Sequence, residues 1–177
     1  MKTTAPRILV LSAESGAGKT QLCIQAIALL RETRARVSGI ISPARFEAGK
    51  KTGIYARDIL SNEQRLLAQP GKQAGLGWVF DPATLDWGSQ VLRAAAPCDV
   101  LVVDELGPLE LERNQGWTVA LDILKTCGCA AALITIRPSL IAVLKERLRG
   151  YDVKVISVTP SSPSAEALRD SVLSRLA

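Results

Sequence analysis

The sequence predicts an α/β protein whose mostly parallel sheet is covered by helices on both faces. Apolar runs of strand length alternate with helical stretches along most of the 177 residues, a pattern typical of parallel sheets. A glycine-rich turn joins the first strand to the first helix. A central segment, residues 43–80, breaks the alternation with short runs separated by turn residues, and predicts an antiparallel hairpin extension of the same sheet.

The first three predicted elements form a βαβ unit. Residues 7–12 (RILVLS) are a continuous apolar run of strand length, residues 18–31 follow as a helix, and residues 37–42 (VSGIIS) make the next strand. The helix is apolar nearly all round, which indicates that it is buried against the sheet. The glycine-rich turn therefore links a strand to a buried helix.

The central segment is expected to contain three hairpin strands, at residues 53–59, 65–69 and 76–80. The Gly-Lys and Gln-Pro-Gly-Lys sequences within it supply turns between them. We therefore expect these strands to continue the sheet beyond its parallel part.

The second half of the chain returns to regular alternation. It begins with a helix over residues 82–96, for which Asp81 is the expected N-cap and Pro82 the first helical residue. The last helix is expected to be capped by Ser164. The remaining predicted strands are 100–103, 130–136 and 153–158, and the remaining predicted helices are 114–126, 138–148 and 164–176.

Length and composition favour one domain over residues 1–177. With 47% apolar residues the chain can bury a substantial core. It has no run of the roughly 18 to 20 apolar residues that would cross a bilayer, and its first six residues lack the apolar segment of a secretory signal. We therefore expect a cytoplasmic protein with no membrane partner.

Composition also excludes several chemistries. The chain contains no histidine, so any general base must be a carboxylate, a lysine or a tyrosine. Its four cysteines complete no zinc site and are expected to be small buried hydrophobes, although Cys127-Gly-Cys129 leaves a redox role open. The net charge of +5 is spread along the chain rather than gathered in a stripe with aromatic neighbours, so nucleic acid is not an expected partner.

The glycine-rich turn has the sequence of a phosphate-binding loop. Residues 13–20 read Ala-Glu-Ser-Gly-Ala-Gly-Lys-Thr between a strand and a helix, the context that a Walker A motif requires. Gly16 and Gly18 let backbone N–H groups approach a β-phosphate, and the helix start adds its positive dipole end. Lys19 is expected to reach the β- and γ-phosphate oxygens, and Thr20 to ligate Mg²⁺. The predicted nucleotide-binding residues are Ala13, Glu14, Ser15, Gly16, Ala17, Gly18, Lys19, Thr20 and Gln21.

One residue departs from the motif. Ala13 stands where the first glycine is usual, which a negative φ angle can accommodate, and the six-residue spacing to Lys19 is intact. The acidic Glu14 is expected to point to solvent. The alternative is a glycine-rich connection without a ligand, but the coincidence of strand, loop, Gly-Lys-Thr and helix favours nucleotide binding.

A second motif supplies the carboxylates that such a loop needs. The apolar run 100–103 ends in Asp104 and Glu105. Asp104 is expected to position Mg²⁺, usually through a water molecule, and Glu105 to polarise the water that attacks the γ-phosphate. Because no long arginine-rich lid is evident, the pair favours hydrolysis over phosphoryl transfer to a small molecule.

Together these motifs resemble the small P-loop nucleoside triphosphatases of the THEP type. Residues 104–111 (Asp-Glu-Leu-Gly-Pro-Leu-Glu-Leu) are similar to that family's Asp-Glu-x-Gly-x-x-Glu-Leu signature, which places Gly107 and Glu110 beside the carboxylates. The likeness extends over residues 8–158. It implies a three-layer, RecA-like P-loop fold and slow, base-tolerant hydrolysis of ATP, GTP or other nucleoside triphosphates to diphosphates, with Mg²⁺ as cofactor.

Other segments match the family in part. Residues 38–43 and 51–54 look like its two Gly-aromatic strand segments, but Ile40 and Ile54 replace the usual aromatic residues. After the last strand, residues 159–162 (Thr-Pro-Ser-Ser) stand in place of an Asn-Arg pair, in the region where a base would bind. The resemblance therefore predicts how the phosphates are bound but does not predict which nucleotide base is preferred.

Two charged residues have a functional interpretation and a plainer one. Arg137 follows the predicted strand 130–136 at the edge where open α/β sheets bind ligands. It is expected to stabilise γ-phosphate charge, with a structural ion pair as the alternative. Glu110 either orients Lys19, a water or an arginine, or is only solvated.

Aromatic and basic residues outside the motifs leave similar alternatives. One of Trp78, Trp87 and Trp117 could stack on the base, although aromatic residues in predicted strands and helices are more often core. Arg45 and Lys50 could fold over the nucleotide or belong to an ordinary solvated hairpin.

These observations predict an enzyme that hydrolyses nucleoside triphosphates. Two alternatives stay open: a nucleotide-dependent switch or accessory protein with an unknown protein partner, and a small-molecule kinase. Steady turnover without a partner supports the enzyme, turnover only with a partner supports the switch, and transfer of the γ-phosphate to a metabolite supports the kinase.

Overall fold

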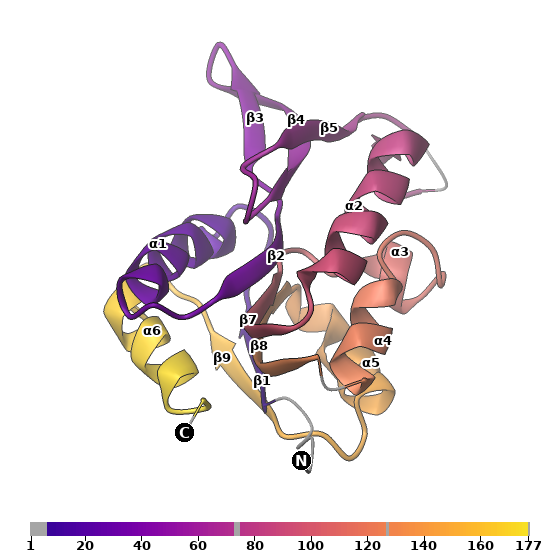
Figure 1. Ribbon diagram of the computed structural model, residues 1–177. Coiled ribbons are helices and arrows are strands. Elements are labelled where there is room, and N and C mark those ends of the chain that lie inside the picture. Colours follow the sequence, from indigo (N-terminus) through magenta and orange to yellow (C-terminus); the bar gives the residue numbers. More distant parts are fainter. Residues whose placement is uncertain (1–6, 73–74, 127, 177) are drawn as a thin grey trace.

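The protein is built on one sheet whose strands are distributed over the whole length of the chain (Figure 1). The computed structural model describes residues 7–72, 75–126 and 128–176. The strands are β1 Arg7–Ser12, β2 Val37–Ile41, β3 Ala44–Glu47, β4 Lys50–Asp58, β5 Gln64–Pro70, β6 Trp78–Phe80, β7 Cys98–Val103, β8 Cys129–Ile136 and β9 Val153–Ser157. The helices are α1 Lys19–Glu32, α2 Pro82–Ala95, α3 Pro108–Leu111, α4 Val119–Lys125, the 3₁₀ turn η1 Pro138–Leu140, α5 Ile141–Arg147 and α6 Ala165–Leu173.

Five strands form the parallel half of the sheet, in the order β2-β7-β8-β1-β9. Each neighbouring pair in this half is parallel, and Leu133 of β8 pairs with Leu9 of β1 on one side and Val102 of β7 on the other. Because parallel strands in register end at the same edge, the segments that follow β1, β2, β7 and β8 meet there. The prediction of a mostly parallel α/β sheet is confirmed.

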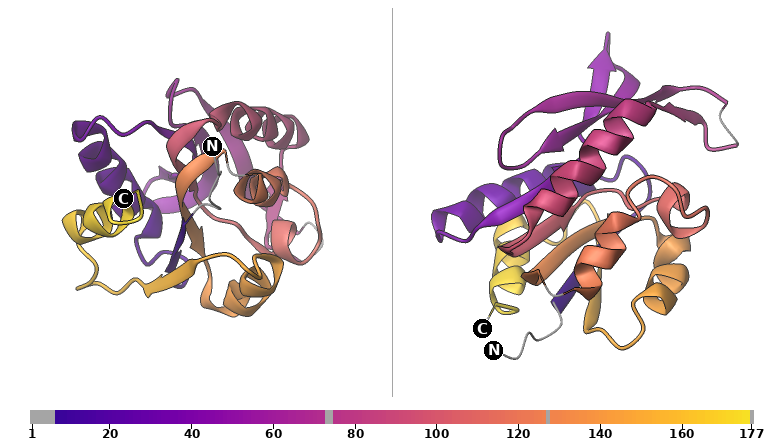
Figure 2. Two further views of the ribbon diagram at one scale, coloured as in Figure 1. Left: turned by 60° about the horizontal axis from the view of Figure 1, so that its bottom comes forward. Right: turned by 45° about the vertical axis from the view of Figure 1, so that its right-hand side comes forward.

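Residues 43–80 extend the sheet with antiparallel strands, as predicted. β4 pairs with β2, and β5 and β6 continue outward from β4. In Figure 1 and in the right-hand view of Figure 2 this extension stands above the parallel half. The strand β3, which pairs with β4 as a hairpin, was not predicted. The side chain of Phe46 in β3 is exposed, so the strand is held by backbone pairing and has no buried face that its sequence could reveal.

Two apolar clusters fill the space between the sheet and its helices. On one face α1 and α6 pack together, with Ile27 and Leu168 against the sheet. On the other face α2, α4 and α5 contribute Leu92, Leu121 and Leu144. Figure 2 shows the resulting three layers, with the sheet in the middle.

The predicted helix caps are confirmed. Asp81 precedes α2, and its Oδ2 accepts a hydrogen bond from the backbone N–H of Thr84 at 2.7 Å. Ser164 precedes α6, and its Oγ accepts from the backbone N–H of Ala167 at 3.2 Å. Both side chains satisfy donors that the first turn of a helix leaves without an intrahelical partner.

Two helix predictions need correction. The predicted helix 114–126 is wrong in its first turn, because α4 begins only at Val119. Asn114 and Gly116 have φ angles of 53° and 66°, and a right-handed helix cannot pass through such left-handed values. The short helix α3 forms upstream instead. The predicted helix 138–148 begins as the 3₁₀ turn η1 before α5.

Three of the four cysteines are buried, as expected of small hydrophobes. Cys23, Cys98 and Cys129 are the buried ones, Cys23 and Cys98 are free thiols, and Cys98 of β7 is the register partner of Cys129 of β8. Cys127 lies outside the described residues, and with it the question of a Cys127-Gly-Cys129 pair. Within residues 7–72, 75–126 and 128–176, no helix has both the length and the apolar character needed to cross a membrane.

Candidate functional site

The phosphate loop lies at the carboxyl edge of the sheet, between β1 and α1. Gly16 and Gly18 have φ angles of 83° and 87°, in the left-handed region that glycine enters without strain. In the part of the chain that the structure describes, no atom lies within 4 Å of where a Cβ on either glycine would sit, so the loop faces open space. Ala13 does not have a positive φ, and it therefore fits the position of the usual glycine as expected.

The Lys19 side chain folds back into this loop. Its Nζ donates to the backbone oxygen of Ala13 at 2.6 Å and to that of Glu14 at 2.9 Å. Burial lowers the pKa of Lys19, and the charges of Glu105 and Asp104 oppose that shift. The two hydrogen bonds brace the loop and use two of the three N–H donors of the ammonium group.

Asp104 is fully buried at the end of β7 and is held from two neighbouring strands. Thr135 Oγ1 in β8 donates to Asp104 Oδ1 at 2.6 Å, and the backbone N–H of Ser42, just after β2, donates to Oδ2 at 3.0 Å. Thr135 Oγ1 in turn accepts from the backbone N–H of Glu105 at 2.7 Å. Each carboxylate oxygen thus has one protein donor and keeps a second lone pair for a water or an ion.

Glu105 adopts a backbone conformation that is uncommon for its residue type. Its φ is 71°, a left-handed value that costs energy in residues other than glycine and that is found preferentially at functional sites. Burial raises the pKa of Glu105, and the nearby charge of Asp104 raises it further. The cations Lys51, Arg137 and Lys19 oppose the shift. A carboxylate with a raised pKa is a better proton acceptor than an ordinary one.

Glu110 is buried and binds the backbone of its own loop. Its two carboxylate oxygens accept from the N–H of Gly107 at 3.0 Å and from that of Trp117 at 3.1 Å. A Cβ on Gly116 would lie 2.3 Å from Glu110 Oε1, so glycine is required beside this carboxylate. The solvated alternative for Glu110 is therefore wrong, and its contacts are with the loop that follows Glu105.

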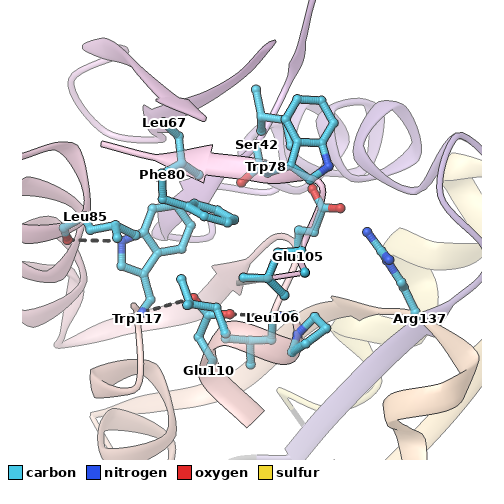
Figure 3. Close-up of a pocket in the computed structure, with 16 residues that line it drawn as sticks. Ser42, Leu67, Trp78, Phe80, Leu85, Glu105, Leu106, Glu110, Trp117 and Arg137 are labelled. Atoms are coloured by element: carbon cyan, nitrogen blue, oxygen red, sulfur yellow. Dashed lines mark hydrogen bonds between the residues drawn. The ribbon is translucent and has the colours of Figure 1, made fainter. Parts of the chain in front are cut away.

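Two cavities meet at Glu105. One, which we call the phosphate cavity, has a volume of about 300 Å³ and lies in front of the phosphate loop. The other, the aromatic cavity, has a volume of about 170 Å³ and lies on the other side of Glu105, beside β5 and β6 (Figure 3). Ser42 and Glu105 line both cavities, so a ligand in either cavity can contact the same two residues.

The structure brings most of the predicted site residues to the phosphate cavity. Glu14 is exposed, as expected, and the lining includes neither its side chain nor Ala13 and Ala17. Arg137 lines the aromatic cavity instead. The predicted residues that line the phosphate cavity are Ser15, Gly16, Gly18, Lys19, Thr20, Gln21, Asp104 and Glu105.

The tryptophans are largely core residues, which is the more frequent role of aromatic residues in strands and helices. Trp87 and Trp117 are buried, and Trp78 and Trp117 line the aromatic cavity rather than the phosphate cavity. Arg45 forms an ion pair with Glu47 on the β3–β4 hairpin, which favours the solvated-hairpin interpretation.

Three residues of the site had no predicted role in it: Ser42, Thr135 and Lys51. Ser42 and Thr135 hold Asp104. Ser42 lies in the segment 38–43 that resembles the family, but no role was predicted for it, and the signal for Thr135 was only a hydroxyl residue near the end of an apolar strand. Lys51 lines the phosphate cavity, and its Nζ lies 5.0 Å from the ring centroid of Trp78. No spacing in the sequence relates Lys51 to Glu105, because the β3–β4 hairpin alone brings it there.

A glycine loop that closes on a buried lysine, opposite an Asp-Glu pair at the end of a parallel strand, defines the class of P-loop nucleoside triphosphatases. Residues 8–176 match the family model described as NTPase, and the chain belongs to that family.

Known proteins agree with this assignment. The chain is similar to nucleoside-triphosphatase THEP1 of Methanopyrus kandleri, with 33% identity over 112 residues, 62% of each chain. It is also similar to nucleoside-triphosphatase THEP1 of Thermofilum pendens, with 29% identity over 161 residues, 88% of each chain. The first match thus spans a little under two thirds of that relative's length.

Two solved structures share the fold. The solution structure of a human cancer-related nucleoside triphosphatase is 25% identical, with a TM-score of 0.71 over 96% of this chain and 97% of that one. The crystal structure of THEP1 from Aquifex aeolicus is 17% identical, with a TM-score of 0.66 over 97% of this chain and 98% of that one. The second likeness concerns the fold alone.

Proposed function

We propose that this protein hydrolyses nucleoside 5′-triphosphates to diphosphate and phosphate, dependent on Mg²⁺, slowly and with little preference among bases. The observation that carries the proposal is the position of Glu105, which lines the same cavity as Lys19 and Thr20 of the phosphate loop. A proton acceptor thus lies across the cavity from the groups that would hold the triphosphate. The names of the chain's relatives support this reaction class.

The phosphate loop would bind the triphosphate mainly through its backbone. The left-handed turns at Gly16 and Gly18 leave the front of the loop open, so that N–H groups can approach phosphate oxygens. Helix α1 begins at Lys19, and its N-terminal end adds positive potential at the same place. The Lys19 ammonium group is already fixed at the loop and would contact the β- and γ-phosphate oxygens.

The donor set in the phosphate cavity suits Mg²⁺. Thr20 offers a hydroxyl and Asp104 a carboxylate, while the described residues contain no group of three or more His, Cys, Asp or Glu side chains placed to hold a metal. Mg²⁺ prefers such sparse oxygen sites, where phosphates and waters complete its coordination. Because both oxygens of Asp104 already accept a protein hydrogen bond, we expect it to act through a bound water. When bound, the ion neutralises charge on the β- and γ-phosphates.

Glu105 would act as the general base. The raised pKa of Glu105 makes its carboxylate a better proton acceptor. The hydrogen bond from its backbone N–H to Thr135 fixes the position of the backbone from which the side chain extends. A water beside Glu105 in the phosphate cavity would lose a proton to the carboxylate as its oxygen bonds to the γ-phosphorus. The bond from that phosphorus to the β,γ-bridging oxygen would break, and the nucleoside diphosphate would leave with that oxygen. Arg137 lies on the other side of Glu105 and would offset the negative charge that develops on the transferring group.

Weak base preference fits the segment after β9. Thr159 and Ser162 are exposed and exchange two backbone hydrogen bonds, of 2.7 Å and 3.2 Å. The residues of this turn, 159–162, have only short side chains, and none offers the amide or guanidinium group that reads a particular base edge. A nucleotide base bound beside this turn would contact backbone and hydroxyl groups, which can hydrogen-bond to any of the common bases.

We also place residues 1–177 in one P-loop domain and in the cytoplasm. The two apolar clusters that cover the sheet draw on elements from β1 to α6, as expected of one folding unit. Cys23 and Cys98 are free thiols, which suits a reducing compartment.

A second candidate function is phosphoryl transfer to a small molecule. The aromatic cavity favours it, because a compound bound there would lie next to Glu105. We rank hydrolysis first, since the phosphate loop, the proposed Mg²⁺ donors and the proposed base all line the phosphate cavity, and water is the only other reactant.

The proposal is tested by measuring phosphate release from ATP, GTP, CTP and UTP, with and without Mg²⁺, for the wild type and Lys19→Ala. We expect Mg²⁺-dependent release from all four nucleotides and its loss in the variant. Nucleotide affinity is measured in parallel by calorimetry. A wild type that binds nucleotide with Mg²⁺ but releases no phosphate would overturn hydrolysis and favour the switch or the kinase.

A further inference from the structure

The aromatic cavity shares Glu105 and Arg137 with the hydrolysis proposed above, but that reaction gives its aromatic walls no role. Its walls include the rings of Trp78, Phe80 and Trp117. In Figure 3, Trp117 lies at one end of the cavity, and Glu105 and Arg137 lie at the other. An apolar cavity with a few polar groups at one end is the usual form of a small-molecule site.

The apolar end of the cavity is already in place without a ligand. The indole Nε1–H of Trp117 donates to the backbone oxygen of Leu85 at 3.2 Å, and its backbone N–H donates to Glu110. Trp117 is 2% exposed, so its ring is held by packing as well as by hydrogen bonds. At the other side Lys51 covers the ring of Trp78. A cavity with fixed walls loses little entropy when it binds a rigid ligand.

The size of the cavity limits its occupant to about one ring. An engineered apolar cavity of about 150 Å³ binds benzene, and the aromatic cavity has about 170 Å³. Three aromatic side chains in its wall favour an aromatic ring over an aliphatic chain, since stacked and edge-to-face contacts add to the burial of apolar area.

The charged end of the cavity selects the polar group of the ligand. Glu105 would repel an anion and Arg137 would repel a cation, and a γ-phosphate in the phosphate cavity would add negative charge beside Glu105. A neutral hydroxyl satisfies both residues, because it donates a hydrogen bond to the carboxylate and accepts one from the guanidinium group.

We propose that the aromatic cavity binds a small neutral aromatic alcohol, with its ring among Trp78, Phe80 and Trp117 and its hydroxyl between Glu105 and Arg137. The bound hydroxyl donates its hydrogen bond to the Glu105 carboxylate, which is then less available to take a proton from the attacking water, so the ligand lowers phosphate release. This second consequence rests on the proposed function, because it takes Glu105 as the base for hydrolysis. Binding itself does not depend on that function.

The binding test uses 4-fluorobenzyl alcohol as the probe and follows its ¹⁹F NMR signal during titration with the intact protein. We expect saturable binding with a dissociation constant on the order of 1 mM, as befits a ligand of this size. Fluorobenzene, which lacks the hydroxyl, should bind about tenfold more weakly. 2-Fluoroethanol, which lacks the ring, should not bind saturably. Equal affinity for all three compounds would overturn the proposal.

A pair of variants tests the location. Leu85 lines the cavity, so the indole of Leu85→Trp would occupy the space of the ligand's ring, and binding should weaken more than tenfold. Leu173→Trp makes the same change in α6, on the opposite face of the sheet, and should bind as the wild type does. Equal binding to Leu85→Trp and wild type would place the probe elsewhere. Glu105→Ala gives a second test without added bulk, because it should lower the affinity for the alcohol to that for fluorobenzene.

Phosphate release is then measured at increasing alcohol concentration. We expect release by the wild type to fall over the concentration range in which the NMR signal saturates, and release by Leu85→Trp to be unaffected by alcohol. Saturable binding without any effect on release would contradict the position of the hydroxyl at Glu105. The NMR signal reports binding and does not require turnover. If the protein proves not to hydrolyse nucleotides, the same NMR titration still tests whether the aromatic cavity binds the alcohol.

Discussion

The hydroxyl of Thr135 joins the two carboxylate residues of the site, because it donates to Asp104 Oδ1 at 2.6 Å and accepts from the backbone N–H of Glu105 at 2.7 Å. The strand β8 thereby fixes the residues that follow β7. Since Thr135 is fully buried, water cannot replace either hydrogen bond if the hydroxyl is removed.

Thr135→Val keeps the shape of the side chain and removes both hydrogen bonds. We expect a loss of about 1–3 kcal/mol in the free energy of unfolding, measured by urea denaturation, with kcat reduced more than nucleotide affinity. Thr135→Ser should retain most of both. Thr52→Val is the matched control, because Thr52 Oγ1 is buried with no hydrogen-bond partner among the described residues. Equal losses in Thr135→Val and Thr52→Val would contradict the role of Thr135.

Glu105→Gln removes the proposed base but keeps its size. Nucleotide affinity should be retained and phosphate release should fall about 10²- to 10⁴-fold, the usual contribution of a general base. Glu112→Gln, an exposed substitution after α3, should release phosphate at the wild-type rate. Unchanged turnover in Glu105→Gln would exclude Glu105 as the base.

The raised pKa of Glu105 also predicts a pH effect on stability. Between the pKa values of the unfolded and folded states, the folded protein binds more protons, so its stability falls as pH rises through this window. At pH values above the folded-state pKa, the buried, charged carboxylate lowers the stability of the wild type by a constant amount. The neutral glutamine side chain does not carry this cost. Glu105→Gln should therefore be more stable than the wild type at pH 7, and the difference should shrink below the ordinary pKa of a glutamate. Thermal unfolding across this range measures it; a constant difference would contradict the raised pKa.

Lys51 should tune the proposed base through its charge. Because Lys51 lowers the pKa of Glu105, Lys51→Ala should move the acidic limb of the kcat/KM profile to higher pH. Lys50→Ala removes the adjacent lysine of the same hairpin, which is exposed and does not line the phosphate cavity, and should leave the limb in place. Equal shifts in the two variants would indicate a change in net charge rather than a contact with the site.

Gly116 is expected to be intolerant of a side chain because of Glu110. Gly116→Ala combines a left-handed φ of 66° with a Cβ 2.3 Å from the Glu110 carboxylate. Gly150→Ala has the backbone strain alone, since the described residues leave its Cβ position open. We expect Gly150→Ala to cost about 1 kcal/mol of unfolding free energy and Gly116→Ala clearly more. Equal costs, measured by denaturant unfolding, would remove the contact as the cause.

Much of the fold could be predicted because its signals are local. The alternation of apolar runs with helical stretches gave the parallel half of the sheet, and the caps Asp81 and Ser164 were readable because a side chain bonds to a residue three positions on. The strand β3 and the late start of α4 were not. β3 buries no apolar face, and α4 is delayed by the left-handed turn at Asn114 and Gly116 that Glu110 stabilises.

The candidate site divides in the same way. Lys19, Thr20, Asp104 and Glu105 belong to short contiguous motifs, and these predicted residues do line one cavity. Thr135 lies 31 positions from Asp104 and meets it only because β7 and β8 are parallel neighbours. A contact between two strands that are distant in the sequence cannot be predicted from the spacing of residues.

The sequence by itself determined the class of this protein, because a phosphate loop binds through the backbone of consecutive residues and a buried strand places Asp104 and Glu105 together at its end. Only the tertiary structure decided how those carboxylates are held and what lies beyond them. The register of β8 supplies Thr135, the β3–β4 hairpin brings Lys51, and β6 and the Glu110 loop together line the aromatic cavity. Each depends on the pairing of distant segments, which is a property of the folded sheet rather than of any local stretch of chain.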